Sequence, residues 1–252
     1  MANLKQITAY LDNLLDTKNI RDSSNNGLQV EGNTEITKIA LCVDACLTSF
    51  RIARQHGAGL VICHHGLSWK DSLKYVTGTN AARLSYLLKN EISLYVSHLP
   101  LDKHPEMGNN IILSKMLSLQ NIKPFGEHEG TSIGYYGQLS EPIDINQLVS
   151  SVNDKLKTNC RLLKFGNNPI RNIGVISGKS KTGLHEAIQL GLDAYFTGEV
   201  EHEYYHLAKE NNINVIGAGH YATETVGVKS LAAMLKKRFN IECIFIDAPT
   251  GL

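Results

Sequence analysis

Three short segments of this 252-residue chain carry side chains that could bind metal ions. The segments are His64-His65, His98 with Asp102, and His220 with Glu224. In the last two, a carboxylate follows the histidine by four residues, and each of the three segments follows an apolar run that predicts a buried strand. Imidazoles and carboxylates without sulfur make a nitrogen and oxygen donor set that suits zinc, manganese, iron, cobalt or nickel.

The adjacent histidines could bind two ions, or one of them could bind an ion while the other supports a neighbouring ligand. Successive side chains of a strand point to opposite faces, so His64 and His65 rarely bind a single ion while the backbone is extended. Two cations about 3.5–4 Å apart need an anionic ligand between them, and Asp102 or Glu224 could supply it. Strand-end histidines that only satisfy backbone groups are the alternative. The matching placement of His220 and the two carboxylates argues for metal.

Three further polar residues are candidates for proton transfer or substrate contact, and we take them as the catalytic candidates. His98 could be a ligand, or it could orient Asp102 and move protons. Glu199 and His202 lie close together at the start of a predicted helix, where ordinary polar residues of a helix N-terminus are an equal alternative. The segment 177–183 joins a strand to a helix and could hold a phosphate, but it lacks Walker spacing and an ordinary loop is as good an interpretation.

Hydrophobic periodicity predicts strands and helices that alternate along most of the chain. The predicted strands are 39–43, 59–63, 92–96, 131–139, 173–176, 195–197, 214–216 and 241–246. The predicted helices are an opening helix through 7–15, then 48–56, 80–89, 110–117, 144–156, 183–190, 202–210 and 224–239. The segment 127–130 is predicted to be a loop.

The second half of the chain repeats the order of elements in the first. A shift of 134 residues aligns Ile39 with Ile173 and Gly57 with Gly191 without a gap. A shift of 122 residues aligns the two segments in which a carboxylate follows a histidine. We interpret this order as an internal duplication, although the common βαβ pattern could also recur by chance.

The repeat predicts an α/β fold of two similar domains. Parallel strands joined by helices carry their chemistry at the carboxyl ends of the strands. We expect residues 1–126 to form the first domain, joined by part of 220–252, and residues 127–219 to form the second. The last predicted helix and strand could pack on either domain.

Composition narrows the class of protein. A hydrophobic content of 42% and a charged content of 19% are ordinary for a soluble globular protein. The net charge of +1 argues against nucleic acid or an anionic membrane as partner. The start of the chain has no signal-peptide core, so we expect a cytoplasmic protein. Five scattered cysteines are best interpreted as buried, reduced thiols.

Six motifs together resemble the NIF-three-like dinuclear metal-centre family, also described as GTP cyclohydrolase I type 2 proteins. They lie at 26–32, 64–66, 98–102, 108–110, 197–199 and 219–224, and they keep the family's order over nearly the whole chain. The resemblance implies that Glu224 bridges the metals and that the ligands are His64, His65, Asp102, His220 and Glu224. Many relatives have proline where this chain has Gly66, a change that touches no ligand.

The resemblance also implies an assembly and an activity. It implies two similar α/β domains with two divalent ions in the cleft between them, and a ring-shaped homohexamer. The implied reaction is hydrolytic opening of the guanine ring of GTP by a metal-bound hydroxide. Alternatives are a dinuclear phosphoesterase, and a metal-binding regulatory or scaffold protein that acts through protein partners. An inserted domain, present in some larger members, has no room in 252 residues.

Overall fold

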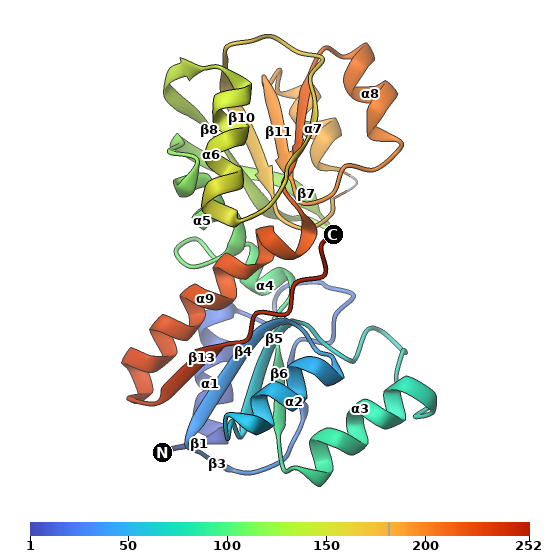
Figure 1. Ribbon diagram of the computed structural model, residues 1–252, viewed down its shortest axis with the longest axis vertical. Coiled ribbons are helices and arrows are strands. Elements are labelled where there is room, and N and C mark those ends of the chain that lie inside the picture. The colour runs from blue at the N-terminus through green and yellow to red at the C-terminus, as the bar shows by residue number, and fades with distance from the viewer. Residues whose placement is uncertain (181) are drawn as a thin grey trace. The chain divides into compact units, whose positions relative to one another are not determined.

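The computed structural model describes residues 1–180 and 182–252, which form two compact units. Unit 1 consists of Met1–Leu101 and Gly227–Ala248, and unit 2 consists of Asp102–Val226 and Pro249–Leu252. Each unit has its own sheet covered by helices, so the predicted α/β class is confirmed (Figure 1). The position predicted as the domain boundary, 126/127, lies inside strand β7 (Gln120–His128) of unit 2.

The sheet of unit 1 has the strand order β13-β4-β5-β6-β2. Its strands are β2 (Gly27–Val30), β4 (Lys38–Asp44), β5 (Leu60–His65), β6 (Ser93–Val96) and β13 (Glu242–Phe245). Only β2 runs antiparallel to its neighbour, and a separate small pair joins β1 (Ala2–Asn3) to β3 (Glu35–Ile36). The helices that belong wholly to this unit are α1 (Leu4–Leu15), α2 (Leu47–Gln55) and α3 (Gly78–Lys89). Because its central strands are buried, they appear in the sequence as continuous apolar runs.

The sheet of unit 2 has the strand order β7-β8-β10-β11-β12-β9. Besides β7, its strands are β8 (Thr131–Ile143), β9 (Arg161–Leu163), β10 (Ile170–Ile176), β11 (Ala194–Thr197) and β12 (Asn214–Gly217). Its helices are α5 (Asn109–Met116), α6 (Ile145–Leu156), α7 (Gly183–Gln189) and α8 (Tyr204–Glu210). The helices α4 (Leu99–Asp102) and α9 (His220–Phe239) contain residues of both units.

Both units are built around the same parallel core. In unit 1, β4, β5 and β6 are adjacent, with α2 and α3 between them in sequence. In unit 2, β10, β11 and β12 are adjacent, with α7 and α8 between them. The shift of 134 residues places Leu60, the first residue of β5, on Ala194, the first residue of β11. The predicted recurrence of βαβ units is therefore present in the fold.

The structure differs from the sequence-based prediction for one loop and for the start of the last helix, and it places the last strand in unit 1. The segment 127–130, predicted as a loop, is the end of β7 and the turn into β8, where His128 pairs with Thr131. Pro124 and mostly polar neighbours give this edge strand no clear apolar alternation. The helix predicted to start at Glu224 begins at His220. The last strand, β13, pairs with β4 in unit 1.

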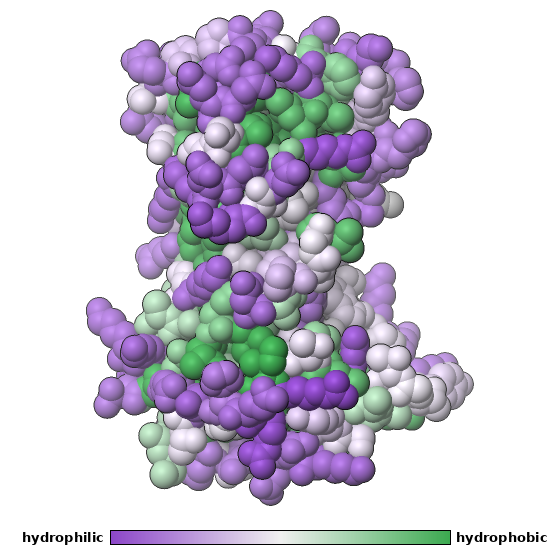
Figure 2. Space-filling view, viewed as in Figure 1, coloured by the Kyte–Doolittle hydropathy of each residue, from purple (hydrophilic) through white to green (hydrophobic). Residues whose placement is uncertain are grey.

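The surface is mostly polar. Figure 2 shows hydrophilic residues over much of the face in view, with apolar residues in smaller areas among them. The exposed large apolar side chains include Tyr75 and Val76, which lie in the segment between β5 and α3. Among the described residues, no helix combines the length and the apolar character that crossing a bilayer requires.

Candidate metal centre

Three imidazoles come together at one edge of the unit 1 sheet. His64 and His65 are the last residues of β5, and His98 lies two residues beyond the end of β6. These strands are parallel neighbours in which Cys63 pairs with Val96, so their carboxyl ends meet at the same edge. The ring centroids of His64 lie 4.7 Å from His65 and 5.0 Å from His98, and those of His65 and His98 are 5.6 Å apart. One ligand atom from each ring lies within 4.8 Å of the others.

Each of these imidazoles is anchored through its Nδ1 atom. The three contacts are His64 to the carbonyl oxygen of Ser97 at 3.0 Å, His65 to Asp44 Oδ1 at 2.9 Å, and His98 to Asp22 Oδ1 at 2.9 Å. A carbonyl or carboxylate oxygen only accepts, so each Nδ1 carries a proton and donates it. Such anchoring orients imidazoles for a metal ion. The donor set therefore fits a divalent cation of the kind predicted from the sequence.

Asp22 is the most heavily engaged of the anchoring groups. Its side chain is 2% exposed and accepts hydrogen bonds from His98 Nδ1 and from the backbone N–H groups of Ser24 and Leu99, at 2.9–3.0 Å. Asn26 Nδ2 donates a fourth at 2.9 Å. Burial alone would raise the pKa of Asp22, but the hydrogen bond and charge of His98, with the other donors, lower it to about 2.

Replacing Asp22 by asparagine is expected to lower the free energy of unfolding by about 2 kcal/mol at pH 7, measured by urea denaturation of metal-free protein. The folded-state pKa of Asp22 lies below its ordinary value of 3.8, so the stabilisation is present above about pH 4. It is lost as the pH falls towards 2, where both proteins should be equally stable. Asp16→Asn, at the exposed end of α1, is the matched control. Equal stabilities of Asp22→Asn and wild type at pH 7 would contradict this account.

In unit 2, His220 and Glu224 lie one turn apart at the start of α9 rather than at a strand end. His220 Nε2 is 3.1 Å from Glu224 Oε1, and His220 Nδ1 is 2.6 Å from Glu199 Oε1. Glu224 is 3% exposed. Burial alone would lower the pKa of His220, but the two carboxylates outweigh it and raise the pKa to about 9. The imidazole is thus held between two anionic groups.

The second buried carboxylate of unit 2, Asp102, lies against the turn that follows β10. It accepts hydrogen bonds from Asn109 Nδ2 at 2.8 Å and from Ser177 Oγ at 3.0 Å. The next residue of the turn, Gly178, has φ +59°, and a Cβ there would overlap the carboxylate of Glu224. Asp102 and Glu224 therefore approach successive residues of one turn.

The same turn begins the segment 177–183 that the sequence offered as a phosphate loop. Its first two residues contact carboxylates, and Lys179 forms an ion pair with Glu201. Lys181 lies outside the described residues. The helix that follows, α7, has seven residues. These contacts give the beginning of the segment a role in positioning the acidic side chains.

Gly178→Ala is expected to weaken metal binding at least about tenfold, because the added Cβ must displace a proposed ligand, Glu224. Gly191→Ala is the matched control, since Gly191 has a similar φ of +63° and nothing within 4 Å of its Cβ position. Both variants carry a backbone cost of about 1 kcal/mol, so only the displacement of Glu224 differs. The measurement is competition with a chromophoric chelator. Equal metal affinities of the two variants would contradict the arrangement.

The remaining predicted catalytic residues differ in their surroundings. Glu199 contacts His220 directly, whereas His202 is exposed in the turn before α8. The sequence reasoning missed Asp22 and Asp44. Asp44 ends β4 opposite His65 of the neighbouring strand, and a carboxylate at that strand end was a usable signal. Asp22 lies in a polar turn segment, and its spacing from the histidines gave no signal.

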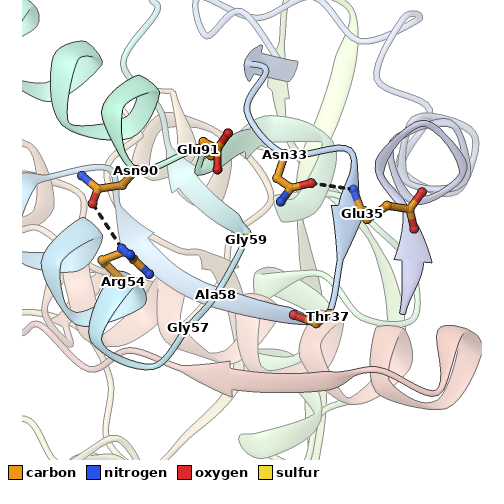
Figure 3. Close-up of a pocket in the computed structure, with 9 residues that line it drawn as sticks. All are labelled: Asn33, Glu35, Thr37, Arg54, Gly57, Ala58, Gly59, Asn90 and Glu91. Carbon is orange, nitrogen blue, oxygen red and sulfur yellow. Dashed lines mark hydrogen bonds between the residues drawn. The ribbon is translucent and has the colours of Figure 1, made fainter.

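A shallow pocket of about 180 Å³ lies at the opposite edge of the unit 1 sheet, where β4 and β5 begin (Figure 3). The side chain of Arg54 donates from Nε to Asn90 Oδ1 at 3.2 Å, and Asn33 Oδ1 accepts from the backbone N–H of Glu35 at 3.0 Å. The pocket is lined by Asn33, Glu35, Thr37, Arg54, Gly57, Ala58, Gly59, Asn90 and Glu91. Because the imidazoles stand at the carboxyl ends of the strands, this pocket is separate from the candidate metal centre.

Comparison with known proteins gives consistent matches over the whole chain. The model of the Duf34/NIF3 (NGG1p interacting factor 3) family matches residues 2–251. A Pyrococcus abyssi protein described as a GTP cyclohydrolase 1 type 2 homolog is 43% identical over 249 residues, covering 98% of this chain and 99% of its own length. The solved structure of the protein ybgI, described as of unknown function, has a TM-score of 0.92 at 32% identity and full coverage of both chains. TTHA1606 from Thermus thermophilus has a TM-score of 0.88 at 35% identity, also with full coverage of both.

Proposed function

Because this chain belongs to the Duf34/NIF3 family, and its anchored imidazoles suit a divalent cation, we propose that it is a dinuclear metal-dependent hydrolase. The observation that carries the proposal is the set of three imidazoles in unit 1, each held through Nδ1 by an acceptor. Burying three polar rings at one edge of a sheet costs free energy, because they replace apolar contacts there. Packing alone therefore does not explain the arrangement.

We propose that five residues hold the ions, with one histidine of the adjacent pair for each ion and Glu224 bridging. They are His64, His65, Asp102, His220 and Glu224. Two features support this choice. The Nδ1 contacts of His64 and His65 fix the orientation of both rings, and the carboxylates of Asp102 and Glu224 are buried, where an anionic group is favoured by a nearby cation.

When bound, two such ions would supply a Lewis acid and lower the pKa of water to about 7. Side chains of the protein would then transfer protons and orient the ligands. The pairing of His98 with the ionised Asp22 holds the ring in one tautomer, with Nε2 able to accept or return a proton. The Glu199 carboxylate contacts Nδ1 of His220 and so orients that ring. We therefore assign Glu199 a positioning role. His202 is exposed in the turn before α8 and stays a candidate for substrate contact.

The substrate that we propose is GTP, with hydrolytic opening of its guanine ring. The description shared by several relatives, GTP cyclohydrolase 1 type 2 homolog, supports this choice. Opening an imidazole ring needs a nucleophile and a proton donor, and the proposed ions and His98 would supply these.

The test is direct incubation with GTP. Protein loaded in turn with zinc, manganese, iron, cobalt or nickel should remove the guanine absorbance and yield a fluorescent pterin after oxidation. The His65→Ala protein is the blank for each metal. An absence of turnover with all five metals would overturn GTP as the substrate. A phosphate-release panel on the same samples then tests the phosphoesterase alternative.

The family description favours a second candidate function. The words "NGG1p interacting factor" refer to an interaction with a protein, which suits a metal-binding scaffold that acts through partners. The homohexamer implied by the resemblance would also suit a scaffold, and light scattering of purified protein would test it. The two candidate functions predict different results when the metal is removed. A scaffold can keep its function without the ions, whereas a metal-dependent hydrolase cannot.

A further inference from the structure

Trp69 lies beside the three imidazoles of unit 1. It is the only tryptophan in the sequence. Its ring centroid is 5.0 Å from that of His98, with the rings at 73°, and 6.1 Å from that of His65, with the rings at 40°. The residue is half-buried, so part of its surface remains accessible to solvent.

The polar groups of Trp69 are satisfied within its own loop. The indole Nε1–H donates to the carbonyl oxygen of Gly66 at 2.9 Å, and the backbone N–H donates to Ser72 Oγ at 2.8 Å. The backbone also forms a bridge with Ser24. Because the indole N–H is already hydrogen-bonded, the interaction that Trp69 can offer a ligand is contact with the apolar face of its ring.

The loop that carries Trp69 is held in place by Gln29. The Gln29 side chain accepts from the backbone N–H groups of Leu67 and Ser68 at 2.8 and 3.0 Å, and it donates to the carbonyl oxygen of Asn25 at 2.7 Å. A Cβ at Gly66 would come within 2.6 Å of the Gln29 amide. Glycine after the histidine pair thus lets the loop fold back over Gln29, which brings the indole to the imidazoles.

We propose that Trp69 determines substrate specificity by stacking against a planar heteroaromatic ring beside the metal centre. The inference rests on the proposed function for the ions, and it adds that the ligand is recognised by its ring rather than by phosphate. Base–aromatic stacking is strong and needs no hydrogen bond. The hydrogen bonds of the loop hold the indole at the surface next to the imidazoles, although full burial would contribute more apolar stabilisation.

The test uses the single tryptophan as a built-in reporter. Full-length, zinc-loaded protein is titrated with guanosine, adenosine and ribose while its intrinsic emission is recorded. We expect quenching by at least one nucleoside and none by ribose. Equilibrium dialysis of the same nucleoside should show binding weakened about tenfold or more in Trp69→Leu, but only a few-fold in Trp69→Phe, which retains a ring. Tyr75→Leu, at a 73% exposed aromatic of the same loop, is the matched control and should bind like wild type.

Several outcomes would overturn the proposal. These are wild type that binds neither nucleoside, Trp69→Leu that binds as tightly as wild type, and Trp69→Leu that loses zinc, which would make the indole a support for the histidines only. The hydrolase proposal fails separately. If nucleosides bind through Trp69 but no metal supports GTP turnover, the reaction is wrong and the stacking stands. If Trp69→Leu hydrolyses GTP with unchanged KM, the stacking is wrong and the reaction stands.

Discussion

The Glu224→Ala protein is expected to bind its metal at least about 100-fold more weakly than wild type, because it lacks the proposed bridging ligand. Glu224 is 3% exposed, contacts the His220 side chain and adjoins the backbone at Gly178, so its surroundings hold the carboxylate in place. Two cations about 3.5–4 Å apart repel each other strongly without an anion between them. The measurement is metal content by mass spectrometry after dialysis against a weak chelator, with affinity from competition.

Glu210→Ala is the control for this experiment. Glu210 is an exposed glutamate at the end of α8 in the same unit, so its removal tests the loss of one carboxylate away from the candidate centre. We expect its metal content to equal that of wild type. Unchanged metal content in Glu224→Ala would remove Glu224 from the ligand set and overturn the proposed bridge. Loss of only one of two ions would keep Glu224 as a ligand but not as the bridge.

The His65→Ala protein is expected to lose hydrolysis of GTP by a factor on the order of 10³ or more. Without bound metal, the pKa of water stays far above neutral instead of falling to about 7, so hydroxide is scarce at neutral pH. His65 is suited to this test because it is a half-buried residue at the end of β5, where truncation leaves a small defect. Steady-state turnover and metal content are measured on the same samples, and thermal unfolding in excess chelator checks that the variant is folded.

His56→Ala, at an exposed position just after α2, is the matched histidine control and should retain both metal and turnover. The scaffold candidate makes the opposite prediction for His65→Ala. A metal-free but folded variant that still complements a strain lacking this protein would favour the scaffold. Turnover that persists after the metal is lost would show that the proposed centre does not perform the reaction.

Much of the candidate centre could be predicted before any fold was known, because strand ends are visible in the sequence. Apolar runs stop at His64-His65 and just before His98, and parallel strands must end at the same edge. The prediction for the third segment, His220 with Glu224, was less accurate, because it placed His220 near a strand end. His220 belongs to the first turn of α9, because the helix starts directly after Gly219, whose φ is +88°. The local sequence around 220–224 does not separate a strand end from a helix start.

The sequence by itself determined the order of βα units, the duplication of their parallel core and the residue types of the candidate donors. These properties depend on residues close together in the chain, through periodicity, strand length and turn residues. The tertiary structure alone decided which acceptor holds each imidazole. Asp44, Ser97 and Asp22 lie 21, 33 and 76 residues from the histidines that they anchor. Such contacts follow from sheet order and register, so even the strand-end signal of Asp44 could not name the histidine that it holds.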